Sequence, residues 1–128
     1  MKLLLDTHIW LWSLREPQKL GRRVLHELHD PANELWLSPV SLWEALLLLQ
    51  KGKISIQMDI QSWQTRAVAR FREAPLTFEI VLTAHELDLH NDPADRFLAA
   101  TAKVLNLTLV TADTRLLGLG DIATLANR

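Results

Sequence analysis

The sequence predicts an α/β fold in which a parallel β-sheet is covered by helices on both faces. Short apolar segments alternate with segments of helical length along the whole chain, and this alternation is typical of parallel sheets. The chain has 128 residues, of which 48% are hydrophobic. We therefore expect a single domain, residues 1–128, with a core of its own.

The expected elements follow from hydrophobic spacing and from breaking residues. The expected strands are residues 2–5, 35–37, 76–78, 107–111 and 122–125. The expected helices are residues 7–14, 19–29, 41–51, 61–72, 80–87 and 94–105, with a short helical turn at 114–117. No internal repeat or linker interrupts this order, which supports one continuous domain.

The first strand contains three consecutive leucines, residues 3–5, and the helix after it must end before Pro17. The next helix is predicted from Leu20, Val24 and Leu28, which are spaced to share one helix face. The helix that begins at residue 41 stops at Gly52, a natural C-terminal cap. Because its residues are apolar on nearly every side, it is expected to be buried all round, in part against a partner subunit.

Composition excludes several kinds of site. The chain has no cysteine, which excludes disulfides, zinc–thiolate sites and a cysteine nucleophile, and suits a reducing cytoplasm. Asp6 interrupts the apolar start of the chain, so neither a signal peptide nor a membrane helix is expected. The net charge of −1 is not that of an indiscriminate nucleic-acid binder.

Four short acidic motifs carry the functional signal. They are DTHIW at residues 6–10, SLWE at 41–44, DPADR at 92–96 and TADTR at 111–115. Each motif places a carboxylate where a strand ends or a helix begins. A divalent cation is the simplest reason to gather such groups, because Mg²⁺ prefers carboxylate, water and phosphate oxygens.

The predicted topology brings these acids together. Asp6 and Asp113 follow strands at the carboxyl edge of the sheet, where open α/β sheets bind ligands. The helix 94–105 runs back from that edge by about 18 Å, and the strand after it returns by about 20 Å, so Asp95 should lie near Asp113. Glu44 is the only ionisable group in a strongly apolar stretch, and a buried carboxylate needs a cation or hydrogen-bond donors.

Helix capping offers a simpler interpretation of each acid. Ser41 and Glu44 have the spacing of a capping box, and Asp6, Asp92 and Asp113 each suit an N-cap position. Asp92, followed by a proline, is the better cap of its motif, which leaves Asp95 as the ligand and Asp92 as a possible one. Caps do not require a shared edge or a carboxylate, so the set as a whole favours a cation site.

Basic side chains beside the acids are candidate phosphate contacts. Arg96 and Arg115 each follow a candidate ligand closely, although ion pairs within the acidic site would explain them equally well. His8 and His90 flank acidic motifs and are candidates to support the ligands. No histidine has the spacing of a zinc site.

The longer segments around these motifs resemble those of the PIN-domain ribonucleases, specifically VapC-type toxins of prokaryotic toxin–antitoxin pairs. The segments are DTHIWLW, SPVSLWEALLL, HNDPADRFLAATA and LVTADTRLL. The resemblance implies a three-layer α/β/α sandwich with a central parallel sheet, Mg²⁺ or Mn²⁺ dependence, a homodimer, and a cognate VapB-type antitoxin as partner. It maps the family's metal-binding acids onto Asp6, Glu44, Asp95 and Asp113.

The leading hypothesis is a cytoplasmic endoribonuclease that cleaves RNA phosphodiester bonds with metal-activated water. One alternative is a Mg²⁺-dependent phosphatase, but such sites often carry a second Asp two residues after the first, and here Thr7 and His8 follow Asp6. The other is a non-catalytic RNA- or protein-interaction module whose acids serve only as caps.

Overall fold

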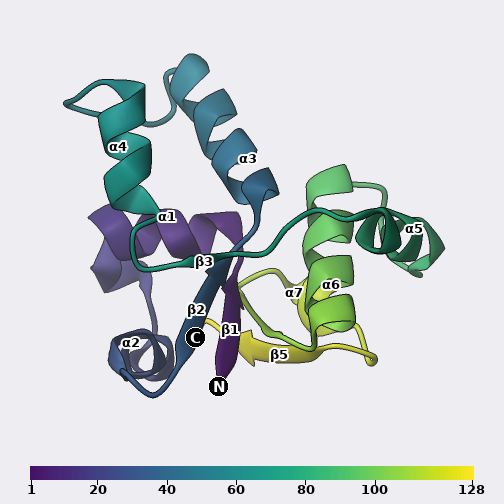
Figure 1. Cartoon of the computed structure of the whole chain (residues 1–128). Helices are drawn as coiled ribbons and strands as arrows, with labels where there is room; N and C mark the ends of the chain where they lie inside the picture. The colour runs from purple at the N-terminus through teal and green to yellow at the C-terminus, as the bar shows by residue number, and fades with distance from the viewer.

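The computed structural model describes all residues from 1 to 128, and its centre is one sheet of five parallel strands in the order β3-β2-β1-β4-β5 (Figure 1). The strands are β1 (Lys2–Leu5), β2 (Glu34–Leu37), β3 (Arg72–Glu73), β4 (Thr108–Thr111) and β5 (Ala123–Ala126). The helices are α1 (Thr7–Arg15), α2 (Arg22–His29), α3 (Pro39–Gln50), α4 (Ile60–Ala67), α5 (Phe78–Glu86), α6 (Pro93–Leu105) and α7 (Thr114–Leu117), with a 3₁₀ turn, η1 (Pro17–Lys19).

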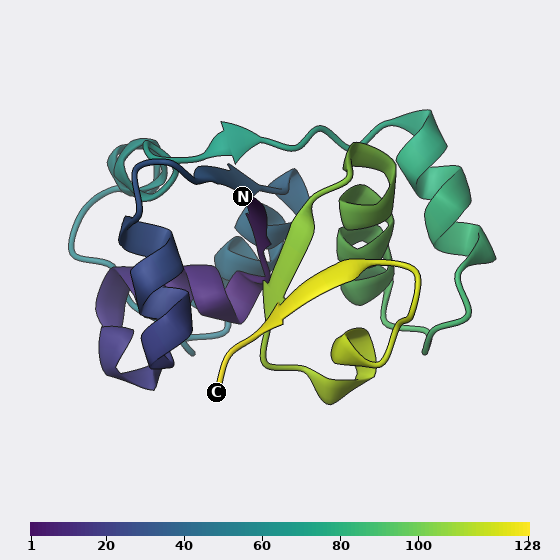
Figure 2. The ribbon, with the colours of Figure 1, turned by 90° about the horizontal axis from the view of Figure 1, so that it is seen from below.

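Helices cover both faces of the sheet, which confirms the predicted α/β/α sandwich (Figure 2). Successive side chains of a strand point to opposite faces. Leu3 and Leu5 of β1 enter a core built with α1, α2 and residues of α3 and α4. Leu4, between them, enters the second core, built with α5, α6 and α7. No helix is both long and apolar enough to cross a membrane.

Several predicted boundaries are wrong. The helix predicted at 19–29 begins at Arg22, because the chain first makes η1 and an extended Leu20. The helix predicted at 61–72 ends at Ala67, and the strand predicted at 76–78 lies instead at Arg72–Glu73, where it pairs with β2. Pro75 has no N–H for a ladder, and Thr77 caps α5 by accepting a hydrogen bond from the Ile80 N–H.

Helix α3 differs from its prediction in its start and its burial. It begins at Pro39 and is capped by Ser38, whose hydroxyl accepts from the Val40 N–H. Ser41 and Glu44 are therefore not a capping box. Within one chain the helix is not buried all round, because only Ser41 and Ala45 are fully buried and Trp43 is 61% exposed.

The sheet order places a topological switch point at β1. The chain leaves β1 through α1 and α2 to reach β2 on one side, and β4 pairs with β1 on the other side. Ligands bind at such points, beyond the carboxyl ends of the strands. The segments that follow β1, β2 and β4 carry Asp6, Glu44 and Asp113 to this edge.

Candidate metal centre

The predicted acids do converge. Asp6, Glu44, Asp95 and Asp113 line one cavity of about 390 Å³, together with Asp92. The other lining residues are His8, Ile9, Trp12, Ala112 and Arg115. The four predicted ligands come from the start of α1, the middle of α3, the first turn of α6 and the start of α7. The fold, and not local sequence, brings them together.

Asp6 directly follows β1 and is held by hydrogen bonds to residues of β4. Its backbone N–H continues the β1–β4 ladder by donating to the Val110 carbonyl (2.9 Å). Its Oδ1 accepts from the Thr7 N–H (2.7 Å), and its Oδ2 accepts from the Thr111 hydroxyl (2.6 Å). The Thr111 oxygen also accepts from the Asp113 N–H (3.0 Å). Thr111 therefore holds two of the acids in one arrangement.

Glu44 is held by a hydroxyl pair rather than by a helix end. The Thr7 hydroxyl donates to Glu44 Oε1, and it also lies 2.9 Å from the buried Ser41 hydroxyl. Because Thr7 has a single hydroxyl proton, it donates to the carboxylate and accepts from Ser41. The hydroxyls of Thr7, Ser41 and Thr111 therefore orient carboxylates of the cavity.

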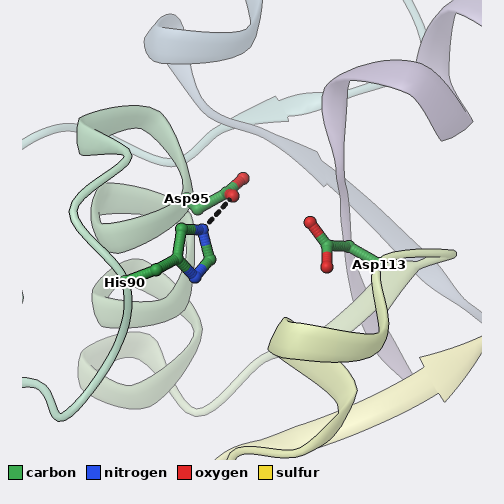
Figure 3. A group of neighbouring side chains, drawn as sticks. All are labelled: His90, Asp95 and Asp113. Carbon is green, nitrogen blue, oxygen red and sulfur yellow. Dashed lines mark hydrogen bonds and ion pairs between the residues drawn. The ribbon is translucent and has the colours of Figure 1, made fainter.

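The structure confirms the predicted cap in the DPADR motif and places Asp95 beside a histidine. Asp92 caps α6 by accepting from the Ala94 N–H (3.0 Å). Asp95, with its side chain only 14% exposed, accepts a 2.7 Å hydrogen bond from His90 Nε2. One ring nitrogen of His90 and single carboxylate oxygens of Asp95 and Asp113 all lie within 4.8 Å of one another, and Figure 3 shows the three side chains together. The supporting role expected for a flanking histidine thus fits His90.

The two arginines of the motifs have different roles. Arg115 stays at the rim, where it chelates Asp113 (2.9 and 3.2 Å) and lies 3.8 Å from Asp95. Arg96 turns away from the cavity, and the prediction that it contacts substrate is not supported. All five of its N–H donors are used by backbone carbonyls of the α5–α6 region. The acceptors are the carbonyls of Ala84, His85, Leu87, Leu89 and His90.

The electrostatics of the cavity favour a cation. Burial raises the pKa of the Asp6, Glu44 and Asp95 carboxyls, and neighbouring carboxylates raise each of them further. Hydrogen bonds from Thr111, Thr7 and His90 oppose this rise. Of the four predicted ligands, only Asp113 has a lowered pKa, because Arg115 donates to it. A divalent cation would offset both the burial and the mutual repulsion of these groups.

The fold and these acids define a class of α/β/α proteins that carry an acidic centre at the carboxyl edge of a parallel sheet. A family model described as PIN domain matches residues 3–121. The chain belongs to the PIN-domain family, which confirms the resemblance seen in the motifs.

Individual relatives agree with this assignment. The chain is 32% identical over 116 residues to Ribonuclease VapC22 of Mycobacterium tuberculosis, covering 89% of this chain and 88% of the relative. The fold is similar to that in a DNA-bound VapBC2 structure from Rickettsia felis, with a TM-score of 0.74 at 19% identity and full coverage of both chains. A DNA-bound VapBC structure from Salmonella typhimurium also has a TM-score of 0.74, at 14% identity and 98% coverage of each.

Proposed function

We propose that the protein is a metal-dependent endoribonuclease and the toxin of a toxin–antitoxin pair. The observation that carries the proposal is the single cavity lined by carboxylates from four separate elements. Oxygen donors of this kind fit Mg²⁺ or Mn²⁺. When bound, such an ion lowers the pKa of water and neutralises charge on phosphoryl oxygens.

The residues of the chain have distinct parts in this proposal. Asp6, Glu44, Asp95 and Asp113 would hold the ion. Thr7 and Thr111 keep two of these carboxylates in fixed orientations, which reduces the reorganisation needed on binding. Arg115 would orient a phosphate at the rim, because its Nη1 makes no hydrogen bond within the protein and its side chain is 60% exposed.

Cleavage of total cellular RNA by the purified protein, free of antitoxin, tests this function. We expect discrete fragments with Mn²⁺ or Mg²⁺, none with EDTA, and none from Asp6→Asn. Asp121→Asn is the matched control, since Asp121 is an exposed aspartate that precedes β5 and pairs with Lys103, at the sheet edge away from the cavity. Metal binding without cleavage would contradict the nuclease, and a phosphorylated Asp6 would indicate the phosphatase.

The failure of Mn²⁺ both to bind and to stabilise the protein would favour the non-catalytic interaction module. A ligand of the native state must raise its apparent stability. In that case Asp6, Asp92 and Asp113 would serve only as the helix caps that they form in the structure.

Exposed apolar surface supports the proposed protein partners. Trp43 on α3 is 61% exposed, and Phe78 and Leu82 on α5 are 95% and 60% exposed. A separate cavity of about 570 Å³, lined by apolar and polar residues, shares His8 and Trp12 with the acid cavity. A VapB-type antitoxin segment bound in this separate cavity would therefore lie next to the acids. Light scattering after size exclusion tests the homodimer, and a mass of 14.6 kDa, that of one chain, would contradict it.

A further inference from the structure

We infer that His90 is a positioning residue for Asp95, and that Arg96 fixes His90 where it can act. The inference rests on the proposed function, because it concerns how one ligand of the ion is oriented. It assigns parts to two residues that neither bind the ion nor touch the substrate.

The contact between His90 and Asp95 leaves one carboxylate oxygen free. His90 Nε2 donates to Oδ2 at 2.7 Å, whereas Oδ1 of Asp95 accepts no hydrogen bond from the protein. A carboxylate held by one oxygen presents the other in a fixed direction. Partners of this kind, bonded to a metal ligand and not to the metal, orient the ligand and strengthen binding.

The geometry favours positioning over direct ligation by His90. With its proton on Nε2, the ring donates to Asp95, and the buried, unprotonated Nδ1 is an acceptor without a hydrogen-bond partner. An ion on Nε2 would have to displace this bond. Mg²⁺ also prefers oxygen ligands to imidazole. In Figure 3 the ring faces Asp95, and Asp113 approaches from a separate element.

Arg96 sets the position of the His90 backbone. Its guanidinium donates to two carbonyls in the last turn of α5 and to three in the connection that follows. The acceptors are Ala84 and His85, and then Leu87, Leu89 and His90. The free carbonyls at a helix C-terminus attract cations. A single planar group with five donors therefore joins the end of α5, the connection and the start of α6. Asp95 and Arg96 are adjacent near the start of α6. The same part of α6 therefore carries both the proposed ligand and the arginine that holds the connection before it.

The first experiment measures Mn²⁺ affinity by following the free ion with electron paramagnetic resonance. We expect His90→Leu to weaken binding by about 10- to 100-fold and His90→Gln to keep most of the affinity. The glutamine amide can place a donor near the position of Nε2, which leucine cannot. His26→Leu is the matched control, because His26 is an exposed histidine on α2 that makes no hydrogen bond.

RNA cleavage supplies a second readout. A positioning role predicts that His90→Leu regains its cleavage rate when Mn²⁺ greatly exceeds the weakened Kd, whereas Asp95→Asn does not. Arg96→Lys should weaken Mn²⁺ binding in the same direction, since one ammonium cannot replace five donors in a plane, and circular dichroism checks that it folds.

Three outcomes would contradict the inference. His90→Leu with wild-type Mn²⁺ affinity would show that the hydrogen bond to Asp95 is not needed. His90→Gln as weak as His90→Leu would show that His90 acts by some means other than donating this bond. Wild-type protein that binds no Mn²⁺ would overturn the proposed function and the inference together, so the two failures are distinguishable.

Discussion

Replacing Asp95 with asparagine should separate the stability of the fold from the binding of the ion. Asparagine keeps a carbonyl oxygen that can accept from His90, but it removes one negative charge from the cluster. Burial, together with the charges of Asp92 and Asp113, raises the pKa of Asp95, so ionised Asp95 lowers the stability of the metal-free fold relative to the unfolded chain. We therefore expect Asp95→Asn to be at least as stable as the wild type in EDTA.

The effect of the ion can be worked out in degrees. At 100 times Kd, Mn²⁺ stabilises the native state by about 2.7 kcal/mol. An unfolding entropy of about 2.1 cal/mol/K per residue, over 128 residues, is about 0.27 kcal/mol/K. The wild type should therefore gain about 10 °C in Tm. If losing Asp95 weakens binding by about 100-fold, the variant gains only about 0.4 kcal/mol, or about 1.5 °C.

Thermal unfolding followed by circular dichroism, in EDTA and in Mn²⁺, measures both effects. Asp92→Asn is the matched control, because asparagine is an equally good N-cap and Asp92 caps α6. The control should keep the full Mn²⁺ shift. A full shift in Asp95→Asn, with its loss in Asp92→Asn, would reverse the assignment of cap and ligand. If the Tm of Asp95→Asn in EDTA were several degrees below that of the wild type, ionised Asp95 would not destabilise the metal-free fold, and the reasoning from its raised pKa would be wrong.

Three further predictions test other parts of the structure. Burial raises the pKa of Asp6, so ionised Asp6 destabilises the metal-free fold. In EDTA, the Tm of Asp6→Asn minus that of the wild type should therefore increase as the pH rises above about 4. A Tm difference that stays constant with pH would contradict this. Over the same range Mn²⁺ affinity in calorimetry should rise, since protons compete for the carboxylates of Asp6 and Glu44; a flat profile would count against them as ligands. Changing Leu4, which is fully buried in β1, to Ala should lower the free energy of unfolding in urea by about 2–5 kcal/mol. The same change at Leu14, which is 39% exposed, should lower it by less.

Regular hydrophobic patterns explain why most of the fold could be predicted. Residues 2–5 and 114–117 have the bounds expected for them, because an apolar run and a capped turn are local signals. Strand β3 has no such signal. Arg72 and Glu73 are exposed and polar, and they form a strand only because they pair with Trp36 and Leu37, so tertiary contact decides their conformation.

The same distinction applies to the site. Asp95 and Asp113 lie close together because the helix and the strand between them have nearly equal lengths. The number of residues between the two acids is therefore enough to predict that they converge. The direction of the Arg96 side chain depends on where α5 ends, which the sequence places only approximately. The capping interpretation of Glu44 requires a helix capped by Ser41. It fails because α3 begins earlier, at Pro39. Small errors in element boundaries therefore changed the interpretation of individual residues while leaving the cluster intact.

The pairing of β1 with β4 also determines when during synthesis the centre can exist. The hydrogen bond from Thr111 to Asp6 joins residues 105 positions apart. At translation rates of about 5–20 residues per second, Thr111 is synthesised about 5–20 s after Asp6. Contacts of such long range form late in folding. A growing chain that already contains Asp6 and Glu44 therefore has no assembled acid cluster, and the ribosome and message that produce it are not exposed to a working nuclease until β4 has emerged and docked.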